Sequence, residues 1–253
     1  MWKGNSMLRA VIFDMDGTLL DSEVIHYIVI NDILKRELGW EQTPEEYLKY
    51  CGIPDQKMWP MMMDEMDSGK VMSLARKWGM ASDEALPSAL SAELERLHWA
   101  EYDLYIEKNG VKAFPGVREL MGALRTEKIR IAVATGSLVR IVRENLKLLG
   151  IEEFVEEIAT SEDCDNGKPA PDVFLLAAKK LGVAPADCLV VEDAGNGLQG
   201  ALSAGMACAG FDGSELPSEL SLAPIVFSDY RKVKPADMRE WHRQQKGSDC
   251  SLE

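Results

Sequence analysis

Two aspartates, Asp14 and Asp16, stand two residues apart where a short apolar run ends in a glycine turn. The run at 10–13 predicts a short buried strand, because its residues are apolar and a turn signal follows them. Two like charges in a dry site are costly, and a divalent cation with oxygen ligands is the usual remedy. Gly17 permits a close backbone approach, and Thr18 adds a hydroxyl. The segment therefore predicts a cation site, with an Asp-rich β-turn as the alternative interpretation.

A second group, Thr135-Gly136-Ser137, follows the apolar run 131–134 and opens a predicted helix. A small hydroxyl, a glycine and free N–H groups at a helix N-terminus form a cradle for an anion. The same residue types are also ordinary helix caps that serve stability alone. Both interpretations stay open on this segment alone.

Two more groups follow later in the chain. Lys168 lies in the stretch 167–172, where two prolines stiffen the loop and Asp172 is placed to cap the next helix. A lysine held in this way suits a fixed positive charge over a phosphate, whereas a solvated surface lysine is the alternative. Glu192 and Asp193 follow the apolar run 189–191, where acids can complete a metal site with the first aspartates.

The elements around these groups alternate in type. Strands are predicted at 10–13, 130–134, 154–159, 188–191, 206–209 and 224–227, and helices at 117–125, 138–149, 172–181 and 197–204. This alternation predicts an α/β fold with a doubly wound parallel sheet. Such sheets bind ligands at the carboxyl ends of their strands, so the four groups are expected to meet there.

The stretch 23–109 differs, because apolar residues recur in it at helical spacing and no strand-like alternation interrupts them. We expect residues 1–21 and 113–253 to form the α/β core and residues 22–112 an inserted helical cap.

In order, residue type and strand context, the four groups match the four motifs of the haloacid dehalogenase superfamily, which the chain strongly resembles. The pattern Asp21-Ser22-Glu23 with His26 is similar to the β-phosphoglucomutase-like branch, which also holds many sugar-phosphate phosphatases. The resemblance implies a Rossmann-like core with a cap. The cap is expected to close over the core and exclude water, with hinges near 20–22 and 111–114.

The resemblance also implies roles for individual residues. Asp14 is the expected nucleophile, and Asp16 is the expected general acid and base. Thr135, Gly136 and Lys168 are expected to hold the transferring phosphoryl group.

The implied cofactor is Mg²⁺, bound by Asp14, the backbone carbonyl of Asp16 and Asp193. Glu192 is expected either to bind the metal directly or to support its ligands, and the sequence does not separate the two.

The expected activity is a Mg²⁺-dependent phosphatase acting on a small phosphorylated metabolite, such as a sugar or polyol phosphate, through an aspartyl-phosphate intermediate. Dehalogenases of the superfamily lack the second aspartate, which this chain keeps. A non-catalytic binding protein is disfavoured because Asp14, Asp16, Lys168 and Asp193 are all present.

The alternative enzyme is a β-phosphoglucomutase-type hexose-phosphate mutase. Such mutases place an arginine in a cap loop to hold a second phosphate, and the corresponding loop here is Gly52-Ile53-Pro54-Asp55. An acid at that position would repel a second phosphate, although Lys57 lies nearby, so a phosphatase is favoured.

The composition limits the kinds of partner and the location that we expect. The 253 residues carry a formal net charge of -14, which argues against a nucleic-acid or anionic-membrane surface. Five scattered cysteines without CxxC spacing indicate reduced thiols and a cytoplasmic location. No apolar run is long enough to span a bilayer, and the start lacks a signal-peptide layout. A monomer or a weak homodimer is expected.

The remaining candidates are weaker. His26 is interpreted either as a group near the active site or as a helix-packing residue, and His98 and His242 predict nothing alone. Methionines in the stretch 58–66 indicate ordinary cap core rather than a substrate lid.

Overall fold

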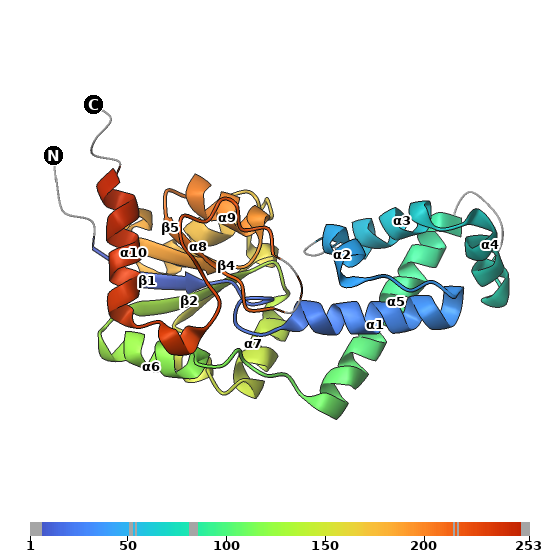
Figure 1. Ribbon diagram of the computed structural model, residues 1–253, viewed down its shortest axis with the longest axis horizontal. Coiled ribbons are helices and arrows are strands. Elements are labelled where there is room, and N and C mark those ends of the chain that lie inside the picture. The colour runs from blue at the N-terminus through green and yellow to red at the C-terminus, as the bar shows by residue number, and fades with distance from the viewer. Residues whose placement is uncertain are drawn as a thin grey trace. The chain divides into compact units, whose positions relative to one another are not determined.

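The chain is divided into two units in the computed structural model, which describes residues 7–248 except 51, 52, 54, 81–85, 215 and 217. The core unit comprises Met1–Ser22 and Val111–Glu253, and the cap unit comprises Glu23–Gly110 (Figure 1). The cap unit begins one residue later than the expected insertion and ends two residues earlier.

A six-stranded parallel sheet lies at the centre of the core unit, with strand order β3-β2-β1-β4-β5-β6 (Figure 1). The strands are β1 Ala10–Phe13, β2 Arg130–Thr135, β3 Glu157–Thr160, β4 Cys188–Glu192, β5 Ala207–Phe211 and β6 Val226–Phe227. β1 and β4 are buried along their whole length, as their continuous apolar runs require in a sheet covered on both faces. The predicted doubly wound α/β fold is confirmed.

Helices cover both faces of this sheet. One hydrophobic cluster joins α6, α7 and α10 to alternate strand residues such as Val11 and Phe13, and the other joins α8 and α9 to Ala10 and Ile12. The helices are α6 Val117–Thr126, α7 Val139–Leu148, α8 Asp172–Leu181, α9 Gly195–Ser203 and α10 Pro235–Ser248. Side chains of successive strand residues point to opposite faces, so both faces need apolar cover.

Most predicted elements of the core begin and end within two residues of the observed ones, and three predictions need correction. Residues 152–154 form a 3-10 helix, so β3 begins at Glu157 rather than at residue 154. Asp172 does not cap α8, because Pro171 occupies the N-cap and Asp172 is the first helical residue. Helix α10 was missed, since Met238 and Trp241 are too few apolar residues for a clear helical period.

The described residues of the cap unit form helices joined by short loops, with no strand among them. Its helices are α1 Ser22–Leu38, α2 Pro44–Tyr47, α3 Asp55–Glu65, α4 Ser68–Lys77 and α5 Leu86–Asn109, with a 3-10 turn at Leu48–Tyr50. Met58, Met62 and Met63 are buried, which confirms that most of the methionine-rich stretch is cap core. Among the described helices of the two units, none has the length and apolar character needed to cross a membrane.

A chain of three polar side chains runs through the cap unit. His26 Nδ1 lies 2.9 Å from His98 Nε2, and His98 Nδ1 lies 2.9 Å from Asp55 Oδ2. His98, which predicted nothing by itself in the sequence, is therefore the middle member of this chain. Gly52 and Pro54 of the loop compared with the mutases lie outside the described residues, whereas Asp55 of that loop is bonded to His98.

Candidate active site

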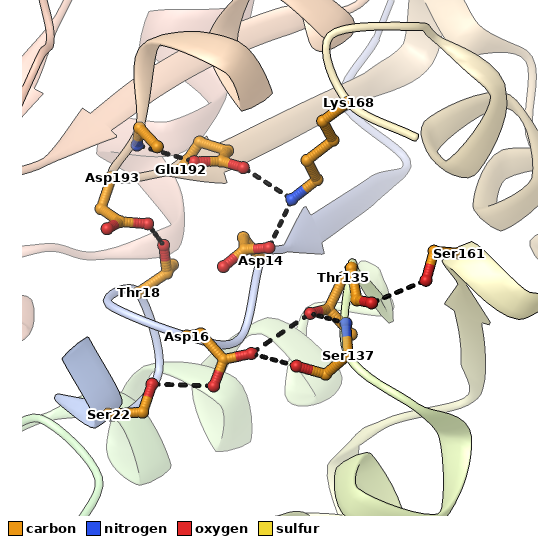
Figure 2. Close-up of polar contacts among 12 residues, drawn as sticks. Asp14, Asp16, Thr18, Ser22, Thr135, Ser137, Ser161, Lys168, Glu192 and Asp193 are labelled. Atoms are coloured by element: carbon orange, nitrogen blue, oxygen red, sulfur yellow. Dashed lines mark hydrogen bonds and ion pairs between the residues drawn. The ribbon is translucent and has the colours of Figure 1, made fainter. Parts of the chain in front are cut away.

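The four groups singled out in the sequence meet at the carboxyl edge of the sheet (Figure 2). Phe13 at the end of β1 pairs with Val133 of β2 on one side and with Val191 of β4 on the other. This register brings the residues that follow the three strands to one edge. β2 and β3 are added on one side of β1, and β4, β5 and β6 on the other, so the strand order reverses between β1 and β4. Open α/β sheets bind ligands at such a reversal point, and it lies at this edge.

Lys168 lies between two buried carboxylates. Its ammonium contacts Asp14 Oδ1 and donates to Glu192 Oε1 at 2.6 Å. Burial would lower the pKa of Lys168, but the charges of Asp14 and Glu192 outweigh burial and raise that pKa above its usual value. The ammonium therefore stays charged, and Phe174 lies under it at 5.0 Å from the ring centre.

The Asp14 carboxylate is buried, with only 5% of the residue exposed. Burial raises its pKa well above the usual value; Lys168 opposes this rise, while Glu192 and Asp16 add to it. The carboxylate is therefore short of positive charge, and a further cation beside it would favour its ionised form.

Both oxygens of Glu192 are engaged within the protein. Oε1 accepts from Lys168, and Oε2 accepts from the Ala194 N–H at 2.8 Å. Gly197 makes room for this side chain, because a Cβ there would lie 1.6 Å from Glu192 Oε1. Glu192 thus joins the lysine to the loop that follows β4.

The Asp16 carboxylate accepts from hydroxyls at both of its oxygens. Ser22 Oγ donates to Oδ1 at 2.7 Å, and Ser137 Oγ donates to Oδ2 at 2.5 Å (Figure 2). Thr135 Oγ1 lies 3.4 Å from the same Oδ2. The sequence assigned no role to these serine hydroxyls, since serine at a strand end or a helix start is common for stability alone.

The segment 135–137 is not an ordinary side-chain cap. Leu138 occupies the N-cap of α7, and no side chain caps that helix. Instead Thr135 Oγ1 accepts from the Ser137 N–H at 3.1 Å, and the Gly136 carbonyl accepts from Ser161 Oγ at 2.6 Å. Ser161 was missed, because it belongs to none of the four groups.

The oxygen groups at this edge fit Mg²⁺. Asp193 Oδ1 accepts from Thr18 Oγ1 at 3.0 Å. The absence of a side chain on Gly17 leaves room for Asp193, because a Cβ on Gly17 would lie 2.0 Å from Asp193 Oδ2. Within the described ranges, no three His, Cys, Asp or Glu side chains form a ready cage for a metal. Mg²⁺ does not need one, since it commonly takes one or two carboxylates together with waters and substrate phosphate. The buried Asp14 and the neighbouring Asp193 supply such a donor set.

Comparison with known proteins agrees with this geometry. The model of the family described as haloacid dehalogenase-like hydrolase matches residues 8–205. The chain belongs to this family. The match extends from β1 to the end of α9 and includes all four groups.

Individual members of the haloacid dehalogenase-like family are similar over most of the chain. Fructose-1-phosphate phosphatase YqaB of Escherichia coli is 31% identical over 198 residues, covering 78% of this chain and 92% of that protein. β-Phosphoglucomutase of Bacillus subtilis is 29% identical over 205 residues, covering 80% and 83%. The structure of CbbY from Rhodobacter sphaeroides in complex with phosphate shares the fold, with a TM-score of 0.71 at 22% identity, covering 92% and 100%. This hydrolase is a phosphatase enzyme.

Proposed function

We propose that this hydrolase is a Mg²⁺-dependent phosphatase that releases inorganic phosphate from a small sugar or polyol phosphate through a phosphorylated Asp14. The observation that carries the proposal is the buried Asp14 carboxylate beside the Lys168 ammonium, with Asp16 two residues further on.

In the first half-reaction, one Asp14 oxygen attacks phosphorus and the bond from phosphorus to the ester oxygen breaks. Asp16 gives its proton to that oxygen, so the leaving group departs as a neutral alcohol. The products are an acyl phosphate on Asp14 and an ionised Asp16. A carboxylate needs no base to act as the nucleophile, unlike a serine hydroxyl.

In the second half-reaction, Asp16 takes a proton from water while the water oxygen attacks phosphorus. The bond between phosphorus and Asp14 breaks, which releases inorganic phosphate and restores the Asp14 carboxylate. Asp16 is protonated again and the cycle closes. Hydroxyls at both Asp16 oxygens hold the side chain in place for these two transfers, since a serine hydroxyl can donate to the ionised carboxylate or accept from the protonated one.

Charge on the phosphoryl oxygens is met by groups already in position. Lys168 supplies a fixed positive charge, and the Thr135 hydroxyl and the Gly136 N–H are the proposed hydrogen-bond donors. Asp14, Asp193 and the backbone carbonyl of Asp16 would hold Mg²⁺, which when bound supplies positive charge to the phosphoryl oxygens and favours ionised Asp14. Glu192 is proposed to orient Lys168 rather than bind the metal, because both its oxygens have protein partners.

Two observations support a sugar or polyol phosphatase rather than a mutase. The relative from Escherichia coli is a fructose-1-phosphate phosphatase. In the cap unit, Asp55 is negatively charged when ionised and is bonded to His98, so this position offers no positive charge for a second phosphate.

A cytoplasmic location is proposed from the thiols. Cys164, Cys188 and Cys208 are free, and burial raises the pKa of Cys188 to about 12 and that of Cys208 to about 11. Such thiols stay protonated and reduced, which suits a reducing compartment.

The test is a panel of sugar and polyol phosphates incubated with the protein and Mg²⁺, with inorganic phosphate measured. β-Glucose 1-phosphate plus its bisphosphate is assayed in parallel for glucose 6-phosphate. We expect phosphate release that EDTA abolishes and Mg²⁺ restores. Asp14→Asn is expected to abolish it, whereas Asp103→Asn, an exposed change on α5, leaves it intact. Isomerisation without phosphate release would identify a mutase instead.

A further inference from the structure

Both polar atoms of the peptide group between Gly136 and Ser137 are hydrogen-bonded. Figure 2 shows the three side chains around it, those of Thr135, Ser137 and Ser161. Its carbonyl oxygen accepts from Ser161 Oγ at 2.6 Å, and its N–H donates to Thr135 Oγ1 at 3.1 Å. A peptide group is planar and rigid, so a contact that fixes the carbonyl also fixes the direction of the N–H. Ser161 therefore sets the direction from which Thr135 receives its hydrogen bond.

This arrangement determines where the Thr135 proton can point. A hydroxyl has one proton and two lone pairs, and the Ser137 N–H occupies one lone pair. The proton must point away from that N–H. Its partner in the structure, Asp16 Oδ2, is 3.4 Å away, which is long for an O–H···O bond. The Thr135 hydroxyl thus points toward Asp16 and is only weakly engaged there, so it can donate instead to an incoming oxygen.

Ser161 reaches Gly136 because the two strands before them are in register. Thr160, the last residue of β3, pairs with Thr135, the last residue of β2. The next residues on the two strands are then neighbours, and Ser161 stands beside Gly136. One residue further on, Glu162 Oε2 accepts from the Val139 N–H at 2.8 Å, so the turn after β3 also holds the first turn of α7.

We propose that Ser161 is a positioning residue for phosphate recognition. Its hydrogen bond orients the Gly136–Ser137 peptide, and this peptide aims the Thr135 hydroxyl at the phosphoryl group. The contact between Thr135 and phosphate rests on the proposed function, whereas the orientation of the peptide is measurable without any substrate.

The first test is a double-mutant cycle measured as kcat/KM on the best substrate of the panel. Ser161→Ala is expected to lower kcat/KM about tenfold, the scale of one lost hydrogen bond in the transition state, mainly through kcat. Ser161→Thr keeps the hydroxyl and is expected to restore most of the activity. Ser203→Ala, which removes an exposed hydroxyl on α9, is expected to have no effect.

In a protein that already carries Thr135→Ala, the further change Ser161→Ala is expected to cost less than about twofold, because Ser161 acts through Thr135. A second tenfold loss in that background would overturn the proposal, since Ser161 would then act independently. A Ser161→Thr variant as slow as Ser161→Ala would also overturn it.

The second test needs no substrate. Amide hydrogen exchange of Ser137, followed by NMR in the unliganded protein, is expected to be about tenfold faster in Ser161→Ala than in the wild type. The Val139 amide is the internal reference, because its acceptor is Glu162. Unchanged Ser137 exchange would refute the positioning role whatever the activity. Faster exchange in a protein that hydrolyses no phosphate monoester would refute the proposed function while the positioning role stands.

Discussion

Lys168 donates to Glu192 Oε1 at 2.6 Å while the same ammonium contacts Asp14, so one buried positive charge links the ends of β1 and β4. Glu192 is almost completely buried, and its other oxygen is fixed by the Ala194 N–H. The lysine is therefore anchored by a carboxylate other than that of the proposed nucleophile. This arrangement separates the residue that orients the lysine from the residues proposed to bind metal.

Replacing Glu192 by glutamine is expected to lower kcat by about 10- to 100-fold, because the amide nitrogen cannot accept from either Lys168 or Ala194 and a buried donor is left unpaired. The Mg²⁺ concentration at half-maximal activity is expected to change less than about threefold, because Glu192 bonds to Lys168 and Ala194 and to none of the proposed metal ligands. Glu127→Gln, which removes an exposed ion pair with Arg239, is the control. A large loss of Mg²⁺ affinity with unchanged kcat would instead make Glu192 a direct metal ligand.

Asp16→Asn tests the proposed acid and base. Hydrolysis of a sugar phosphate is expected to fall by about 10²- to 10⁴-fold, because its alcohol is a poor leaving group that needs a proton. The loss in the formation of phosphorylated Asp14 from p-nitrophenyl phosphate is expected to be less than about tenfold, since that leaving group departs without one. The rate of the first half-reaction is measured by rapid quench for both esters. Equal losses on the two esters would contradict the acid role.

The sequence predicted the elements and motifs that local chemistry dictates. Asp14, Thr135 and Glu192 each stand at the end of an apolar strand. Because strands and helices alternate along the core, the strands are predicted to be parallel and these residues to meet at one edge of the sheet. The partners that hold them were not predictable, because the contacts join residues far apart and of ordinary type. Ser161 reaches Gly136 across 25 residues.

The cap unit shows the same limit. His98 reaches Asp55 across 43 residues, and neither belongs to a motif that would pair them. Such contacts depend on how the strands and helices pack, which a helical or alternating pattern does not encode.

Gly17→Ala is expected to lower activity by more than about 100-fold. Gly17 has φ +79°, which an alanine adopts with strain, and the new Cβ would meet Asp193 at 2.0 Å. The matched control is Gly79→Ala, since Gly79 has φ +71° and no neighbour within 4 Å of a Cβ. Both variants are expected to lose about 1 kcal/mol of unfolding free energy from backbone strain. The measurements are urea unfolding and phosphate release, and equal activity in the two variants would contradict the Asp193 contact.

The lowered pKa of His26 predicts that the unfolding free energy decreases in mild acid. Burial, with a further contribution from His98, lowers the pKa of His26 from 6.5 to about 3, and Asp55 opposes this shift only partly. Between pH 6.5 and 3 the unfolded chain therefore binds a proton at this residue that the folded chain does not. The unfolding free energy should decrease as pH falls through that window, by up to about 1.4 kcal/mol per pH unit from this group. Urea unfolding at pH 7, 6 and 5, followed by circular dichroism, measures the slope for the wild type and for His26→Gln. The variant should lose less stability between pH 7 and 5 than the wild type, and identical slopes would show that His26 takes up its proton equally in the folded and unfolded chains.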